Sequence, residues 1–201
     1  MIRVLLAEDQ AMVRGALSAL LTLEEDIEIV SEVSRADQIV ECALATQPDI
    51  ALLDIEMPGG DGLTAAASLH ETVSDCRIII LTTFGRPGYL RKAMESGVVG
   101  FLVKDTPASE LAIAIRRVMA GERVIDPELA TAALSAGRNP LTDREQSVLS
   151  VAANGSSNAK VARILHLSEG TVRNHLSSAI QKLDARNRTE AVHIASQKGW
   201  L

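Results

Sequence analysis

The sequence has few aromatic residues, few cysteines and no long apolar run. Phe, Tyr and Trp make up 2% of the 201 residues, so the core must be built from Leu, Ile, Val and Ala, which suits helices packed on a sheet. The longest apolar runs fall far short of the roughly 20 residues that a membrane span needs. Cys42 and Cys76 follow no metal-ligand spacing and indicate reduced core thiols. We therefore expect a cytoplasmic protein with no membrane partner.

Charge is distributed unevenly along the chain. Residues 1–121 carry 10 Lys and Arg against 18 Asp and Glu, a net charge of −8. From residue 138 onward the count is 9 against 5, a net charge of +4. Met1 leads directly into an apolar run, so we expect no signal peptide. The mildly basic C-terminal part suggests a polyanionic partner.

Strand and helix patterns alternate through the first 121 residues, which predicts an α/β domain with a parallel sheet. Helical patterns lie near residues 10–23, 35–46, 62–72, 87–96 and 106–120. Residues 122–139 contain Pro127, are followed by Pro140 and lose the strand pattern, which predicts a linker with a short helix around 127–135. Residues 140–201 predict a small all-α domain of four short helices.

Polar residues follow four of the predicted strands. Glu8 and Asp9 follow the first apolar run, and Asp54, Thr82 and Lys104 end three later ones. Ligands collect beyond the carboxyl ends of parallel strands, so these side chains should meet in one crevice. Any one of them alone would be a helix cap or a surface residue. Their convergence predicts a site for a divalent cation and a phosphoryl group.

The expected chemistry is the formation of an acyl phosphate. Glu8, Asp9, Asp54 and the carbonyl of Glu56 would hold Mg²⁺, and Asp54 would also be the nucleophile. The Lys104 ammonium and the Thr82 hydroxyl would bind phosphoryl oxygens.

Residues 1–121 resemble the receiver domain of bacterial two-component response regulators. The matching residues are Glu8-Asp9, Asp54 with Met57-Pro58 and Asp61-Gly62, Thr82, Phe101 and Lys104. The resemblance implies a flavodoxin-like fold with five strands in the order 2-1-3-4-5. It also implies phosphorylation of Asp54 by a sensor histidine kinase, with Thr82 and Phe101 moving inward together. This chain departs from the common pattern at Glu8, where Asp is commoner, and at Asp105, where Pro is usual.

The C-terminal helices contain a candidate helix-turn-helix with its second helix beginning after Ser168. Val172, Leu176, Ile180 and Leu183 form an apolar stripe, which leaves Arg173, Asn174 and Ser177 exposed. Arg and Asn form bidentate hydrogen bonds with guanine and adenine, and Thr171 and Lys182 are placed to hold phosphates. The periodicity alone fits a protein-binding helical bundle equally well.

Further short segments of this region resemble the LuxR-type helix-turn-helix. They include Leu141-Thr142-Asp143-Arg144-Glu145, Thr171-Val172-Arg173-Asn174-His175, Lys182-Leu183 and Arg186-Asn187-Arg188-Thr189-Glu190-Ala191. The chain as a whole resembles NarL/FixJ-type response regulators, which implies a transcriptional regulator that dimerises on phosphorylation and binds paired half-sites in a promoter. Glu8-Asp9-Gln10, Thr82-Thr83-Phe84 and Arg86-Pro87-Gly88-Tyr89 are similar to regulators that control lipid desaturase genes together with a membrane-fluidity sensor kinase.

Two other functions fit part of the sequence. A phosphatase could use Asp54 as nucleophile and Glu56 as general acid, and it would hydrolyse phosphomonoesters. A pure interaction protein would use its C-terminal helices to bind another bundle, and it would show no salt-dependent DNA binding. The C-terminal motif and the lack of a substrate-capping insertion favour a regulator over an enzyme.

Overall fold

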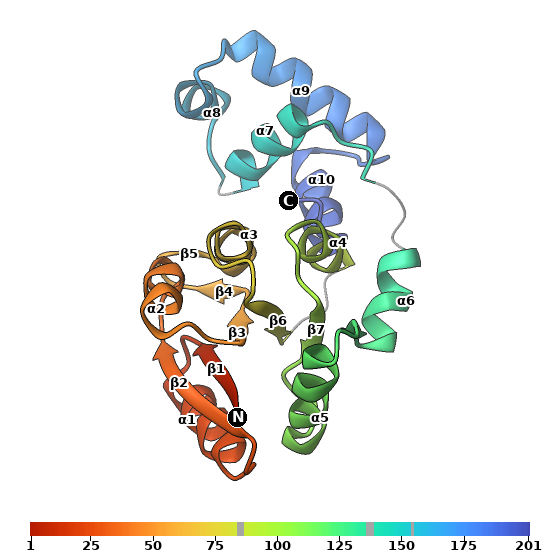
Figure 1. Ribbon diagram of the computed structural model, residues 1–201. Helices are drawn as coiled ribbons and strands as arrows, with labels where there is room; N and C mark the ends of the chain where they lie inside the picture. Colours follow the sequence, from red (N-terminus) through yellow and green to blue (C-terminus); the bar gives the residue numbers. More distant parts are fainter. Residues whose placement is uncertain (84–86, 136–138, 154) are drawn as a thin grey trace. The chain divides into compact units, whose positions relative to one another are not determined.

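A computed structural model describes residues 1–83, 87–135, 139–153 and 155–201 (Figure 1). The chain divides into an N-terminal α/β unit and a C-terminal helical unit, which we describe separately. Phe84 and Arg86, which contribute to the resemblance to the desaturase regulators, lie outside the described residues. None of the helices in the described ranges is both long and apolar enough to cross a membrane.

The N-terminal unit is built on a parallel sheet with the strand order β2-β1-β3-β6-β7-β8. The first five strands have the expected order, and a short sixth strand is added at the β7 edge. The strands are β1 (Ile2–Ala7), β2 (Ile27–Val33), β3 (Ile50–Asp54), β6 (Arg77–Thr82), β7 (Gly100–Val103) and β8 (Val124–Ile125). The expectation of five strands is corrected here, because β8 falls within the predicted linker and pairs with β7 at Gly100 and Phe101.

The predicted helices of this unit are present and, apart from the start of α2, lie within two residues of the expected limits. They are α1 (Ala11–Thr22), α2 (Ile39–Thr46, preceded by a 3-10 turn at Ala36–Gln38), α3 (Gly62–Thr72), α4 (Pro87–Glu95) and α5 (Ala108–Met119). The short helix α6 (Pro127–Ser135) follows β8. A two-stranded ribbon, β4 (Glu56–Met57) with β5 (Gly60–Asp61), connects β3 to α3.

Both faces of the sheet are covered. Alternate strand residues such as Leu6, Leu52 and Ile79 form one cluster with apolar residues of α1 and α5. Their neighbours Leu5, Leu53 and Ile80 are equally buried and point to the opposite face, where α2 and α3 lie together. Burial on both faces explains why the strands read as continuous apolar runs.

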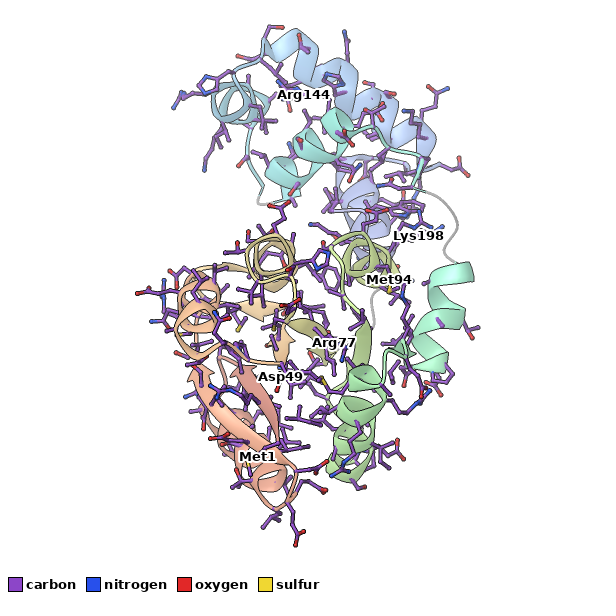
Figure 2. The ribbon with its side chains drawn as sticks, in the orientation of Figure 1. Met1, Asp49, Arg77, Met94, Arg144 and Lys198 are labelled. Carbon is purple, nitrogen blue, oxygen red and sulfur yellow. The ribbon has the colours of Figure 1, made fainter. Side chains whose placement is uncertain are left out.

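Polar contacts fasten the edge of the sheet that lies at the amino ends of the strands. The guanidinium of Arg77 donates to the Met119 carbonyl at the end of α5 (2.7 Å), and the Arg77 amide donates to the Asp49 carbonyl (2.9 Å). Figure 2 labels Asp49 and Arg77. The candidate site lies at the opposite edge, where the strands have their carboxyl ends.

The C-terminal unit contains α7 (Asp143–Ala153), α8 (Asn158–Leu165), α9 (Glu169–Lys182) and α10 (Arg188–Gln197). Local hydrogen bonds define where the helices begin. Ser157, Ser168 and Asn187 cap α8, α9 and α10 through bonds to backbone amides 3.0–3.3 Å away. The chain turns between α8 and α9 at His166, which has a left-handed conformation (φ +53°). Val148, Val161, Val172, Ala179 and Ala191 are completely buried in the shared core.

Candidate functional site: an acidic pocket and a helix-turn-helix

The sheet register brings the predicted phosphoryl-site residues together. Ala7 pairs with Leu53, so Glu8 lies beside Asp54 at the ends of β1 and β3. The amide of Lys104 donates to the carbonyl of Thr82 (2.8 Å), which joins the ends of β6 and β7. The carboxylate oxygens of Glu8, Asp9 and Asp54 lie within 4.8 Å of one another. The four strand ends therefore form one pocket.

Lys104 connects two carboxylates of this pocket. Its ammonium lies 2.6 Å from Glu8 Oε2 and 2.8 Å from Asp54 Oδ2. The side chains of Lys104, Glu8 and Asp54 are 9%, 1% and 6% exposed, so water screens these attractions weakly. The pocket thus holds a cation between two acids.

Burial and charge shift the pKa values of two of these groups. Burial raises the pKa of Glu8 above its ordinary value, although the contact with Lys104 opposes this shift. Burial by itself lowers the pKa of Lys104, but its hydrogen bonds to Asp54 and Glu8 outweigh burial and raise the pKa overall. Lys104 therefore stays charged at neutral pH.

The donor set of the pocket fits a hard divalent cation. Three carboxylates so close together repel one another, and Mg²⁺ prefers carboxylate oxygens. Among the buried side-chain oxygens and nitrogens of the described residues, only Glu8 Oε2 lacks a hydrogen bond of normal geometry, despite its ion pair with Lys104. An open depression lined by Asp9, Glu56, Met57, Pro58, Asp61 and Tyr89 adjoins the pocket.

Two further residues, Arg14 and Gly62, hold the pocket in shape, and only Gly62 belongs to a segment that the sequence singles out. Arg14 on α1 donates to the carbonyl of Glu8 (2.6 Å) and lies 3.6 Å from Glu32. Gly62 begins α3 so close to β3 that a Cβ atom there would lie 2.0 Å from the Asp54 carbonyl oxygen. Asp61-Gly62 is part of the receiver-like pattern, but nothing local in the sequence identifies Arg14, since its partners Glu8 and Glu32 come from other elements.

The expected switch residues differ in their surroundings. Thr82 ends β6 and is 4% exposed, beside Lys104. Phe101 on β7 is completely buried, so its side chain is already directed inward in this structure. The side chain of Glu56, the general acid of the phosphatase alternative, is exposed.

The candidate recognition helix α9 has the predicted buried and exposed faces. Val172, Leu176 and Leu183 are buried, Ile180 is half-buried, and Ala179 completes the stripe. Arg173, Asn174 and Ser177 are exposed on the other side. The Thr171 hydroxyl lies 2.8 Å from that of Ser168. The residue Lys182 is exposed, but its ammonium lies 2.7 Å from Glu145 Oε2.

Comparison with known families assigns both units. Residues 4–116 match the response regulator receiver domain, and residues 139–195 match the bacterial regulatory proteins of the luxR family. The chain therefore belongs to the response regulators that join a receiver to a LuxR-type DNA-binding domain. It is a phosphorylation-controlled, DNA-binding transcriptional regulator, as the sequence predicted.

Individual relatives span the whole chain. The sequence is 48% identical to the transcriptional regulatory protein DesR of Bacillus subtilis (strain 168) over the full length of both proteins. It is 36% identical to LiaR of the same organism, over 97% of each chain. The crystal structure of the response regulator ChrA, from a heme-sensing two-component system, is similar with a TM-score of 0.59 and 34% identity, over 100% of this chain and 98% of ChrA. A structure of RcsB with DNA (TM-score 0.68, 23% identity, 98% of each chain) shows the same fold.

Proposed function

We propose that Asp54 accepts a phosphoryl group from a sensor histidine kinase in the cytoplasm and that this controls dimerisation and promoter binding. The observation that supports this best is the position of Lys104, 2.6 Å from Glu8 and 2.8 Å from Asp54 in a buried pocket. A cation placed there can move from carboxylate oxygens to the oxygens of an incoming phosphoryl group.

The reaction follows from the placement of Asp54. One of its carboxylate oxygens attacks the phosphorus of the phosphohistidine, the P–N bond breaks, and the imidazole leaves and takes up a proton. The product is an acyl phosphate on Asp54. Lys104 then pairs with one phosphoryl oxygen, and the hydroxyl of Thr82 donates to another.

Mg²⁺ would be held by the carboxylates of Glu8, Asp9 and Asp54 and by the carbonyl of Glu56. When bound, it supplies positive charge that neutralises repulsion between the carboxylates and the phosphoryl oxygens. Glu8 is longer than the commoner Asp, and its Oε2 is the buried oxygen without a well-directed hydrogen bond. The residues present therefore suit the ion.

Phosphorylation would act as a switch through Thr82 and Phe101. Thr82 would move toward the phosphoryl oxygen, and this would hold Phe101 in the buried position that it has here. This change would favour a homodimer, which presents two recognition helices to paired half-sites in promoter DNA. A coupling of about 1–3 kcal/mol would change binding roughly 5–150-fold.

DNA recognition is assigned to the exposed side of α9. Arg173, Asn174 and Ser177 would meet base edges, and Thr171 would meet a phosphate. Replacing Arg173 with Ala should cost about 1–3 kcal/mol and relax specificity at one base-pair position. Binding of DNA variants substituted at each position measures this loss. Equal weakening on every sequence would instead make Arg173 a phosphate contact.

The switch is tested by comparing the wild type with Asp54→Asn, with Mg²⁺ and with or without acetyl phosphate. Sedimentation gives the mass, and titration with promoter DNA gives the affinity. We expect acetyl phosphate to produce dimers and tighter binding in the wild type, and neither effect in Asp54→Asn. Asp75→Asn is a matched control, because Asp75 lies in an exposed turn and should leave the response intact. A response that persists in Asp54→Asn would refute the mechanism.

A further inference from the structure

Glu145, in the first turn of α7, is the one buried charged side chain among the described residues from 139 to 201. It is 4% exposed, whereas the cations and acids of the other helices lie at or near the surface. A buried carboxylate is costly unless charged or hydrogen-bonded partners satisfy its oxygens. The position of its partners therefore indicates what Glu145 does.

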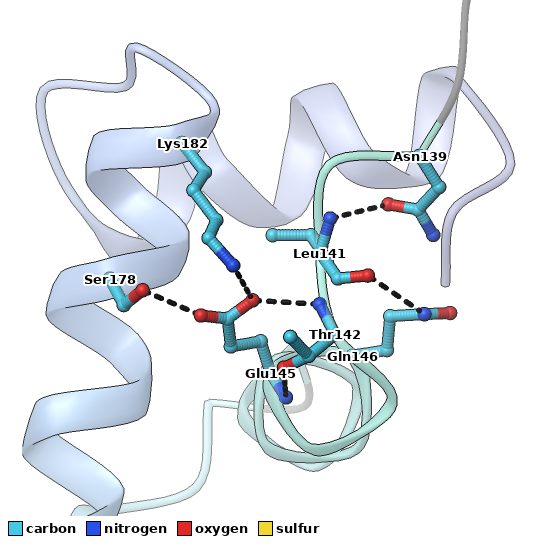
Figure 3. A network of polar contacts seen from close by, with 7 residues as sticks. All are labelled: Asn139, Leu141, Thr142, Glu145, Gln146, Ser178 and Lys182. Carbon is cyan, nitrogen blue, oxygen red and sulfur yellow. Dashed lines mark hydrogen bonds and ion pairs between the residues drawn. The ribbon is translucent and has the colours of Figure 1, made fainter.

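Both oxygens of Glu145 are occupied (Figure 3). Oε1 accepts a hydrogen bond from the Ser178 hydroxyl (2.5 Å), and Oε2 accepts from the Lys182 ammonium (2.7 Å). Oε2 also accepts from the Thr142 amide (2.7 Å), and the Thr142 hydroxyl accepts in return from the Glu145 amide (3.3 Å). These two reciprocal bonds form a capping box at the start of α7, and its Glu145 side chain also holds the recognition helix.

Ser178 and Lys182 lie on one side of α9, since residues four apart differ by about 40° around a helix. Arg173 lies nine residues before Lys182, or about 180° away, and the exposed Ser177 lies four residues after Arg173 on the same side. The exposed Asn174 lies between the two sides. The contacts with Glu145 therefore fix the rotation of α9 about its own axis. They leave the opposite side free for DNA.

We infer that Glu145 is the positioning residue of the recognition helix and that Lys182 is its ion-pair partner instead of a phosphate contact. This inference rests on the proposed DNA-binding function and revises the role of Lys182 within it. The contacts with the DNA backbone then come from other groups, such as the half-buried Thr171 on α9 and the exposed Lys160 and Arg163 on α8.

Two readouts on the full-length protein test this inference. The first is urea unfolding followed by the fluorescence of Trp200, the only tryptophan, which packs in the core of the helical unit. The second is the affinity for a short DNA duplex of mixed sequence at several salt concentrations. Each phosphate contact contributes about 0.9 to the slope of log K against log salt, a quantity that a purely structural role does not change.

We expect Lys182→Met to lower the folded-to-unfolded ratio at least about tenfold, because it leaves a buried carboxylate without its cation. The double variant Glu145→Gln, Lys182→Met removes that charge and should regain much of the stability and of the DNA affinity. The salt slope should equal that of the wild type in both. Lys160→Met is the matched control for stability, because Lys160 is exposed and should leave the unfolding midpoint unchanged.

A salt slope lowered by about 0.9 in either Lys182 variant would overturn the inference, whatever the midpoint does. An unchanged midpoint in Lys182→Met, or a double variant that regains neither stability nor affinity, would overturn it as well. If the wild type shows no salt-dependent DNA binding, the proposed function fails. In that case the unfolding midpoints of the single and double variants still show whether the Glu145–Lys182 ion pair stabilises the helical unit.

Discussion

Replacing Lys104 with Met tests the electrostatics of the acidic pocket directly. The substitution keeps most of the side-chain volume but removes the ammonium that lies 2.6 Å from Glu8 and 2.8 Å from Asp54. Two nearly buried carboxylates, with Asp9 beside them, would then repel each other without a cation. The folded receiver should become markedly less stable in the absence of Mg²⁺.

The magnitude follows from distance and burial. At such separations and an effective dielectric constant of about 20, each attraction amounts to about 6 kcal/mol before the cost of desolvation. Removing one partner of a buried pair typically costs about 3–5 kcal/mol, and we expect a loss in this range. Lys92→Met is the matched control. Lys92 lies 3.6 Å from Asp61, and their side chains are 60% and 39% exposed, so the loss there should stay below about 1 kcal/mol.

Urea unfolding followed by far-ultraviolet circular dichroism measures both variants, with EDTA or with Mg²⁺. Trp200 fluorescence reports the unfolding of the helical unit. The unfolding transition seen by circular dichroism but not by Trp200 fluorescence is therefore that of the receiver. Mg²⁺ at about 100 times its dissociation constant should restore about 2.7 kcal/mol. The loss should also shrink at acidic pH, because without Lys104 the pKa of Glu8 rises further and the carboxylate takes up a proton. A loss no greater than that of Lys92→Met would refute the reasoning.

Two other predictions concern single residues. The pKa of Glu145 is lowered to about 2 from an ordinary value of 4.5, because the bonds from Lys182, Ser178 and Thr142 outweigh burial, which by itself would raise it. Since the folded pKa of Glu145 is below the unfolded one, this stabilisation is complete above pH 4.5 and is lost as the pH falls toward 2. Urea unfolding followed by Trp200 fluorescence should show a free energy of unfolding that falls over this pH range. In Glu145→Gln this pH dependence should be weaker. A Cβ at Gly62 would meet the Asp54 carbonyl, so Gly62→Ala should destabilise the receiver by about 1–3 kcal/mol, whereas Gly15→Ala, with open space in α1, should stabilise it by roughly 0.5–1 kcal/mol. Equal unfolding midpoints for these two glycine variants would contradict the packing argument.

The sequence by itself determined the elements and the convergence of the acidic pocket. Apolar runs that end in Asp54, Thr82 and Lys104 predict parallel strands, and parallel strands end at a common edge. Capping residues such as Ser168 act within three residues of the chain, so their effect can be read locally. Helix limits were predictable for the same reason, whereas the order of the strands was an implication of the resemblance to receiver domains.

Other features were decided only by tertiary structure. The strand Val124–Ile125 is too short to show a pattern, and it forms because the edge of β7 offers unpaired backbone groups. The contact of Arg14 with the Glu8 carbonyl depends on how α1 packs against the sheet. Lys182 looked like a phosphate contact because its charge and position on α9 are visible in the sequence. Its partner Glu145 lies 37 residues away, and only the packing of α7 against α9 brings the two together.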